Sequence, residues 1–126
     1  MTTYLLNAFS TTMLPNGGMV EFTNLVDATE ASAGLTGAEH EPDFVSAVGH
    51  EGTAAVFSQL LNLPVQVARV MVTLNPGDWA VVGQLNTRLP EGKVLSAEEL
   101  AGLPIRWVLV HIKGQEESLQ ESLDAR

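Results

Sequence analysis

Two short segments, Gly49–Thr53 and Gln84–Lys93, carry a histidine and an arginine that could act on a phosphate. The chain is otherwise poor in positive charge, with 6 Lys and Arg residues against 15 Asp and Glu residues. If a helix begins near His50, the amides of its first turn are free and carry the positive end of the helix dipole. Such a turn attracts phosphate groups. Together the two segments predict a phosphate-binding site.

His50 is the candidate proton donor. An unperturbed histidine changes its protonation near neutral pH, so this side chain can give a proton to a leaving group. The amides of Glu51, Gly52 and Thr53 would bind the phosphate, and Gly52 leaves room for a ligand because it has no side chain. The alternative is that His50 only caps a helix.

Arg88 is the candidate residue for stabilising negative charge. It follows a predicted strand and precedes the turn-forming sequence Leu89–Gly92. The planar guanidinium group binds phosphate through two parallel hydrogen bonds. Glu91 could orient Arg88, and Gln84 could bind the polar edge of a base. The alternative is a surface arginine beside a surface glutamate, which contributes little.

Three further polar residues are candidates for ligand binding. Arg69 lies among valines in a predicted strand, and a cation in that setting needs an anionic partner, either a carboxylate of the fold or a ligand. Asn7 and Ser10 lie at the exit of the first predicted strand and could bind ribose or phosphate. The alternative for these two residues is an ordinary turn.

Several classes of chemistry are excluded or disfavoured by composition and motifs. The chain has no cysteine, which excludes a thiol nucleophile, a disulfide and a thiolate metal site. The three histidines show no metal-binding spacing, so we predict no metal and no cofactor. Glycine-rich dinucleotide and nucleotide triphosphate motifs are absent, as is the nucleophilic serine motif of hydrolases.

The charge distribution argues against an extended duplex DNA partner. The formal net charge is -9, whereas binding to duplex DNA depends on many Lys and Arg residues. Residues 52–113 nevertheless hold five Lys and Arg residues against four Asp and Glu residues, so a small anion can bind there. No apolar run approaches the length of a membrane span and the first residues lack a basic signal region, so we expect a cytoplasmic protein.

Hydrophobic patterns and turn signals predict the elements that would position these residues. The predicted strands are Tyr4–Phe9, Gly18–Leu25, Val65–Leu74, Trp79–Leu85 and a central Ile105–Ile112. The turn sequence Asn75–Asp78 joins the third and fourth of these strands as a hairpin. The predicted helices are Asp43–Val48, His50–Asn62 and Ala97–Leu103, the last with a capping box at its start. Residues 27–41 show no clear period, residues 1–113 form one domain, and residues 114–126 form an acidic tail.

The order of these motifs resembles that of the small viral and prokaryotic ring nucleases, a family that includes viral anti-CRISPR proteins. The resemblance covers most of the chain from Tyr4 to Ile112. The residues that carry it are Tyr4–Ser10 with Met13 and Leu14, then Val48–Thr53, then Arg69 with Val70, and then Gln84, Arg88, Leu89, Glu91, Gly92, Lys93 and Leu95.

The resemblance implies a homodimer of single α/β domains, each with a mixed β-sheet flanked by helices. It implies that the dimer binds cyclic tetra-adenylate, the second messenger of type III CRISPR defence, and cuts it without a metal. His50 would protonate the leaving 5′-oxygen while a 2′-hydroxyl of the substrate attacks its own phosphodiester. Arg88, oriented by Glu91, would stabilise the phosphorane. The residues implied to hold phosphate, ribose or adenine are Arg69, Gln84, Asn7 and Ser10.

The expected product is a linear di-adenylate that ends in a 2′,3′-cyclic phosphate. Three other interpretations remain open at this point. One is a protein that sequesters a cyclic oligonucleotide without cutting it, for which His50 would be unnecessary. Another is a DNA-binding viral regulator, which the charge balance opposes. The last is a structural interaction protein, in which Arg69 and Arg88 are simply paired surface residues.

Overall fold

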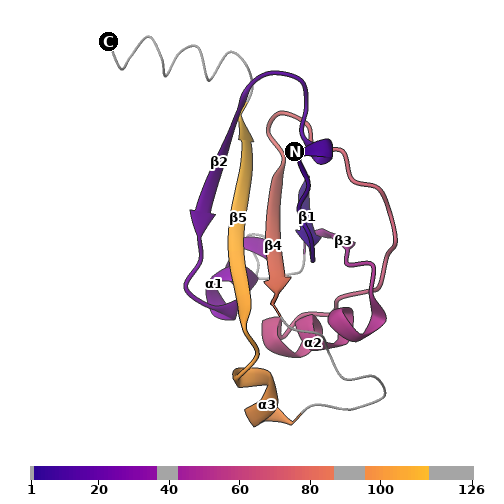
Figure 1. The fold of residues 1–126 in the computed structure, drawn as a ribbon, viewed down its shortest axis with the longest axis vertical. Coiled ribbons are helices and arrows are strands. Elements are labelled where there is room, and N and C mark those ends of the chain that lie inside the picture. Colours follow the sequence, from indigo (N-terminus) through magenta and orange to yellow (C-terminus); the bar gives the residue numbers. More distant parts are fainter. Residues whose placement is uncertain (1, 37–42, 87–95, 114–126) are drawn as a thin grey trace.

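A mixed five-stranded sheet runs through the molecule (Figure 1). The computed structural model describes residues 2–36, 43–86 and 96–113. The strands are β1 (Thr3–Leu6), β2 (Met19–Asn24), β3 (Val45–Ala47), β4 (Trp79–Leu85) and β5 (Ile105–Lys113), in the spatial order β2-β5-β4-β1-β3. Strand β1 pairs in parallel with β3 and β4, whereas β5 is antiparallel to β2 and β4. The expected single α/β domain with a mixed sheet is therefore confirmed for the described residues.

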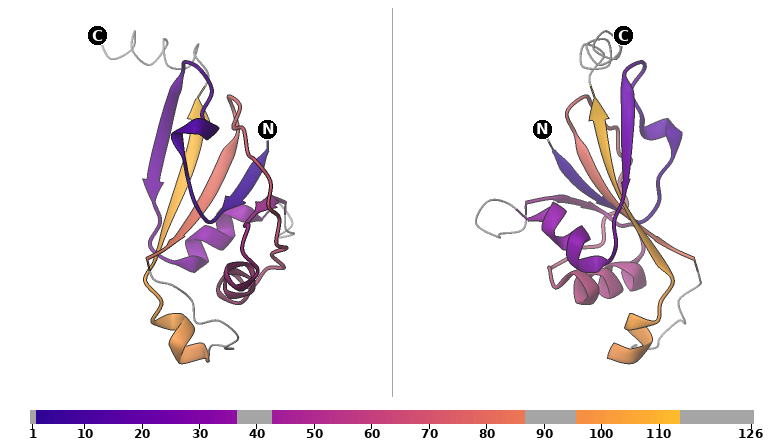
Figure 2. Two further views of the ribbon diagram at one scale, coloured as in Figure 1. Left: turned by 45° about the vertical axis from the view of Figure 1, so that its right-hand side comes forward. Right: turned by 90° about the vertical axis from the view of Figure 1, so that its left-hand side faces the viewer.

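Helices α1 (Ala28–Leu35) and α2 (Glu51–Leu61) lie on one face of the sheet (Figure 2). The short 3₁₀ turn η1 (Thr11–Met13) lies on the other face. The short helix α3 (Ala97–Ala101) leads into β5 and begins with the predicted capping box, in which Ser96 and Glu99 bond to each other's backbone amide. Both helices that cover the sheet lie at the same end of it, where β4 ends.

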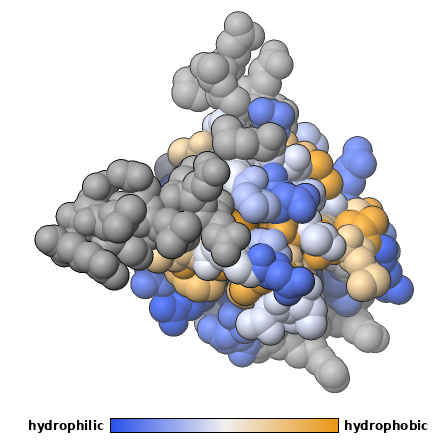
Figure 3. Space-filling view, turned by 90° about the horizontal axis from the view of Figure 1, so that it is seen from above, coloured by the Kyte–Doolittle hydropathy of each residue, from blue (hydrophilic) through white to orange (hydrophobic). Residues whose placement is uncertain are grey.

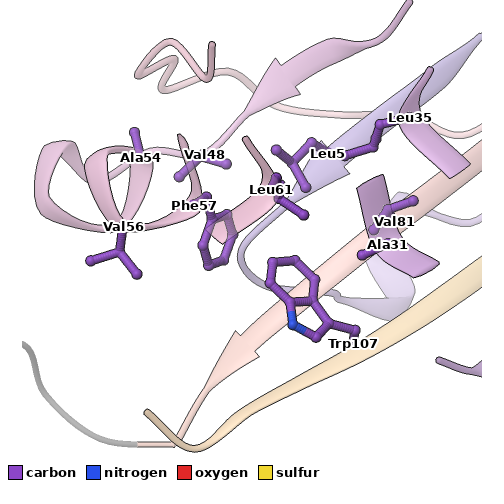
Figure 4. Close-up of a cluster of buried hydrophobic side chains, with 10 residues drawn as sticks. All are labelled: Leu5, Ala31, Leu35, Val48, Ala54, Val56, Phe57, Leu61, Val81 and Trp107. Carbon is purple, nitrogen blue, oxygen red and sulfur yellow. The ribbon is translucent and has the colours of Figure 1, made fainter. Parts of the chain in front are cut away.

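The hydrophobic core on the helix side joins α1 and α2 to the central strands (Figure 4). The rings of Phe57 and Trp107 contact each other, with centroids 5.0 Å apart. Gly83 on β4 lies directly beneath this pair. A Cβ atom added there would lie 2.7 Å from Cζ of Phe57 and would also overlap the Trp107 ring. Only glycine leaves room for these two rings to pack on β4.

The other face of the sheet has its own apolar layer, against which Met13 of η1 packs and which α1 and α2 do not cover. Its buried residues are Leu6, Val72, Leu74, Ala80, Val82, Val110 and Ile112. Val72 and Leu74 belong to an irregular segment that runs from the end of α2 to the start of β4. Figure 3 looks at the end of the molecule where β4 begins, and apolar and polar residues are interspersed on its coloured surface.

The predictions for the strands at 4–9, 18–25, 79–85 and 105–112 are confirmed as β1, β2, β4 and β5, although β1 is shorter than expected. The helix predicted from His50 to Asn62 is α2, and the helix predicted from Ala97 is α3. Strand β5 has a paired strand on each side, as a central strand should.

The helix predicted at Asp43–Val48 is wrong, because this segment contains strand β3. Val45 pairs with Tyr4 of β1, and Ala47 pairs with Leu6. A short apolar segment does not distinguish helix from strand by its own pattern, and here the pairing with β1 decides.

The hairpin predicted around Asn75–Asp78 is also wrong. The turn itself is present, since the Asp78 amide donates to the Asn75 carbonyl at 2.9 Å. The segment before it is not a strand, however, and makes only one isolated bridge, between Val67 and Val48. Strand β4 pairs instead with β1 and β5.

Helix α1 occupies most of the segment that the sequence left unassigned. Asp27 caps its start by accepting a hydrogen bond from the Glu30 amide at 3.1 Å, and Glu30 accepts in return from the Val26 amide at 2.8 Å. Only Ala31 and Leu35 are buried in this helix. Two buried residues in eight give too weak a period to recognise in the sequence.

Candidate functional site

The carboxyl ends of β1, β3 and β4 lie at the same end of the sheet, because these three strands are parallel. Leu6 of β1 pairs with both Ala47 of β3 and Val82 of β4. Asn7 therefore follows β1 at the same level at which β3 leads into Gly49 and His50. In open α/β sheets, ligands bind outside the carboxyl ends of the strands. Helix α2 starts at this end of the sheet.

His50 is the N-cap of α2 and is exposed. Its Nδ1 atom accepts a hydrogen bond from the Thr53 amide at 3.3 Å, and the Thr53 hydroxyl lies 3.5 Å from the same nitrogen. The helix-capping role raised as an alternative is therefore real. It uses only one ring nitrogen, and Nε2 has no hydrogen-bond partner among the described residues.

The amides at the start of α2 are only partly available to a ligand. The expectation that the Thr53 amide is free is wrong, because that amide donates to His50. The amides of Glu51 and Gly52 have no acceptor within the part of the chain that the structure describes. An anion approaching α2 can therefore meet two free amides and the positive end of the helix dipole.

Arg69 lies beside the residue that precedes His50. Its Nε atom donates to the Gly49 carbonyl at 2.8 Å, and a Cβ atom added to Gly49 would lie 3.4 Å from Cγ of Arg69. The backbone holds this arrangement, because the Ala68 amide donates to the Val48 carbonyl at 2.8 Å. The chain after α2 thus returns along the end of β3 and brings Arg69 to the start of the same helix.

The expected environment of Arg69 needs correction. Arg69 is exposed and outside any strand, and the partner found for it is a carbonyl rather than a carboxylate. Its terminal guanidinium nitrogens have no partner among residues 2–36, 43–86 and 96–113. Sequence reasoning did not identify the Gly49 carbonyl as the group that orients this side chain, and no sequence signal marks it.

Gln84 and Ser10 are placed differently from His50. Gln84 is exposed near the end of β4, opposite Arg106, and shares the alternation of Ala80 and Val82 on the face away from the helices. Ser10 caps η1, with its hydroxyl accepting from the Thr12 amide at 3.3 Å. No described hydrogen bond links Asn7, Ser10 or Gln84 to His50.

The structure thus brings His50, Arg69, Glu51 and Gly52 together around the start of α2. Arg88 and Glu91, the other two residues predicted to act in catalysis, lie outside the described residues, as does the acidic tail at 114–126. Within the described ranges, no group of three His, Cys, Asp or Glu residues is arranged to hold a metal ion. None of the described helices is long and apolar enough to cross a membrane.

The model of the STIV B116-like family matches residues 3–107. This chain belongs to the STIV B116-like family. The B116 protein of Sulfolobus turreted icosahedral virus has a similar structure, with a TM-score of 0.78 and 30% sequence identity. The similarity covers 88% of this chain and 99% of that one.

Proteins of other viruses are also similar to this chain. The ORF116 protein of Acidianus filamentous virus 1 is 37% identical over 100 residues, which cover 79% of this chain and 83% of the relative. Protein 26 of a Sulfolobus islandicus filamentous virus is 33% identical over 96 residues, covering 76% and 78%. The family match includes His50, Arg69, Arg88 and Glu91, whereas the residues after 107 lie outside it.

Proposed function

We propose that this protein is a metal-independent ring nuclease. It would cut cyclic tetra-adenylate into linear di-adenylate with a 2′,3′-cyclic phosphate and so switch off type III CRISPR signalling. The observation that carries the proposal is the position of His50, exposed at the start of α2 with Nε2 unpartnered among the described residues. Arg69 lies next to it, on the Gly49 carbonyl.

This arrangement suits a reaction in which the substrate supplies its own nucleophile. The 2′-hydroxyl gives up its proton to solvent, its oxygen forms a bond to the adjacent phosphorus, and the bond from phosphorus to the 5′-oxygen breaks. The His50 imidazolium gives its Nε2 proton to the departing 5′-oxygen, which leaves as a hydroxyl group, and the ring becomes neutral with its remaining proton on Nδ1. The protein then needs only a proton donor and groups that stabilise the charge of the phosphorane.

The charge-stabilising groups would come from two parts of the chain. Arg69 and the free amides of Glu51 and Gly52 would bind the phosphate at the start of α2. Arg88, oriented by Glu91, would stabilise the phosphorane. Asn7, Ser10 and Gln84 would hold ribose or adenine. The geometry supports the assignment of Arg69, Glu51 and Gly52, because these residues lie together with His50 at the carboxyl ends of the parallel strands.

We also propose that the protein acts as a homodimer in the cytoplasm. A ring of four nucleotides cut into two equal halves has two equivalent scissile phosphates. A two-fold symmetric dimer would present one His50 to each of them. The viral origin of the relatives supports a role against host defence.

Incubation with cyclic tetra-adenylate in EDTA tests the proposal. Products are identified by mass, beside a His50→Ala variant and a protein-free control. We expect the wild-type protein to yield di-adenylate and the variant to bind the ring without cutting it. Tight binding without cleavage by the wild type would identify a protein that sequesters the ring. Absence of binding, or tight and steeply salt-dependent binding to duplex DNA, would overturn the proposal.

A further inference from the structure

Thr53 is a buried polar residue whose hydroxyl the proposed reaction does not use. It is 8% exposed and lies in the first turn of α2. Asp78, the other buried polar or charged residue of the described core, uses its carboxylate to accept from the amides of Thr2 and Asn75. In contrast, the Thr53 hydroxyl has one partner among the described residues, the Nδ1 atom of His50.

The Thr53 amide selects one form of the neutral imidazole. A backbone amide can only donate a hydrogen bond, so the nitrogen 3.3 Å from it must present a lone pair. That nitrogen is Nδ1 of His50, and the ring proton of the neutral side chain therefore lies on Nε2. The hydrogen bond the ring makes through one nitrogen thus decides which nitrogen carries the proton.

The Thr53 hydroxyl serves the charged form of the same ring. In the imidazolium both nitrogens carry a proton, and Nδ1 can no longer accept from the amide. The hydroxyl oxygen, 3.5 Å from Nδ1, is then the atom placed to accept the new proton. The charged groups that the described contacts place at the start of α2 are Glu51, the next residue in the chain, and Arg69, whose Nε donates to the Gly49 carbonyl.

We propose that Thr53 is a positioning residue that engages Nδ1 of His50 in both protonation states, with its amide for the neutral ring and its hydroxyl for the imidazolium. Nε2–H then stays directed away from the helix, toward a bound ligand. Transfer of the Nε2 proton to a leaving oxygen leaves the remaining proton on Nδ1, where the Thr53 hydroxyl still accepts it, and exchange with water then restores the resting form with its proton on Nε2. The catalytic consequence of this arrangement rests on the proposed function, whereas the two hydrogen bonds can be measured without any substrate.

Nuclear magnetic resonance of protein labelled with ¹⁵N in its histidine rings tests the hydrogen bonds. At the alkaline end of a pH titration, where the ring ¹⁵N shifts identify the neutral form, we expect the His50 ring to carry its proton on Nε2. At the acidic end of the same titration, where the ring ¹⁵N shifts identify the imidazolium, the Nδ1 proton should exchange slowly with water in the wild type and in Thr53→Ser. The same proton signal should be lost in Thr53→Val, which keeps the amide but lacks the hydroxyl.

Kinetics on cyclic tetra-adenylate give the second readout. We expect kcat of Thr53→Val to fall about tenfold with KM changed less than about twofold, because the imidazolium is less well placed for the chemical step. Thr53→Ser should stay within about twofold of the wild type in kcat, because it restores the hydroxyl. Thr23→Val, an exposed threonine on the edge strand β2, is the matched control. Thermal unfolding of each variant verifies that it is folded.

The outcomes separate this inference from the proposed function. A neutral His50 ring with its proton on Nδ1 overturns the inference, and so does an Nδ1 proton that persists in Thr53→Val or a Thr53→Val variant with wild-type kcat. If the wild type does not cleave the ring, the proposed function fails. The resonance measurements then decide alone whether Thr53 holds the ring, because they need no cleavage.

Discussion

The two histidines of the described structure lie at opposite ends of the sheet, and their surroundings differ in kind. His50 follows β3 at the carboxyl ends of the parallel strands, exposed and held through one nitrogen. His111, near the end of β5, pairs across the strands with Trp79, the first residue of β4. Its ring is half-buried and stacks on the Trp79 ring, with centroids 3.9 Å apart and an angle of 14° between the planes.

The difference shows how placement assigns different roles to the same side chain. A ring stacked on an aromatic partner contributes contact area to the sheet. The His50 ring caps a helix through Nδ1, and its Nε2 has no partner among the described residues, which is the feature on which the proposed proton transfer rests. The end of the sheet that holds His50 also has the amides of Glu51 and Gly52, for which the described residues provide no acceptor, whereas the end that holds His111 has a cross-strand ion pair between Glu21 and Lys113.

The largest expected effect comes from replacing His50, the proposed proton donor, with a residue that still caps the start of α2. Asparagine is among the best N-cap residues, so His50→Asn should change the free energy of unfolding by less than about 1 kcal/mol. Cleavage should fall about 10²- to 10⁴-fold, because the leaving oxygen loses its acid. Initial rates with cyclic tetra-adenylate measure this. His111→Asn should leave the rate within about twofold, and equal losses in the two variants would remove the distinction between the histidines.

A large effect on stability is expected at Gly83, in the core near the His50 end. A methyl group there overlaps Phe57 and Trp107, so Gly83→Ala should lower the free energy of unfolding by about 1–3 kcal/mol. Denaturant titration measures the loss. Gly34→Ala is the control, because its added Cβ would contact only Val81 Cγ2, at 3.4 Å, and Gly34 is exposed in helix α1. That change should stabilise by about 0.5–1 kcal/mol. A Gly83→Ala variant as stable as Gly34→Ala would contradict the packing described.

A smaller, more specific effect is expected for the arginine beside His50. Arg69→Ala should raise KM roughly tenfold and leave stability nearly unchanged, since the side chain is exposed and bonded to one carbonyl. Arg106→Ala is the matched control. Arg106 is also exposed, and its guanidinium donates to Asn24 at 3.0 Å on β2, away from the start of α2. If the two variants raise KM equally, Arg69 is not part of the binding site.

The smallest expected effect concerns the ion pair at the His111 end. Glu21 and Lys113 approach to 3.1 Å, and the Glu21 side chain is 53% exposed. Glu21→Gln should therefore cost less than about 0.5 kcal/mol of unfolding free energy, and the difference should shrink with added salt. Thermal unfolding at low and high ionic strength measures it. A loss above 1 kcal/mol at high salt would show that the pair contributes more than a surface contact.

Prediction from sequence succeeded where the signal is local. The capping box at Ser96–Glu99, the turn at Asn75–Asp78 and the helix after His50 each depend on neighbouring residues alone. Prediction failed at 43–48 and at 65–74, because strand pairing depends on residues distant in the chain. In the candidate site, the residue types at 50 and 69 were recognised, but the carbonyl that orients Arg69 was not.

The sequence by itself determined the elements with strong local patterns: the apolar strands at 79–85 and 105–112, the amphipathic helix from 51 and the lack of thiol chemistry. The tertiary structure alone decided that β3 pairs with β1 and that Arg69 returns to the start of α2. It also decided that Nδ1 rather than Nε2 of His50 is engaged. The reason is physical: periodicity and caps act within a few residues, whereas pairing and the choice of a ring nitrogen depend on which groups folding brings into hydrogen-bond distance.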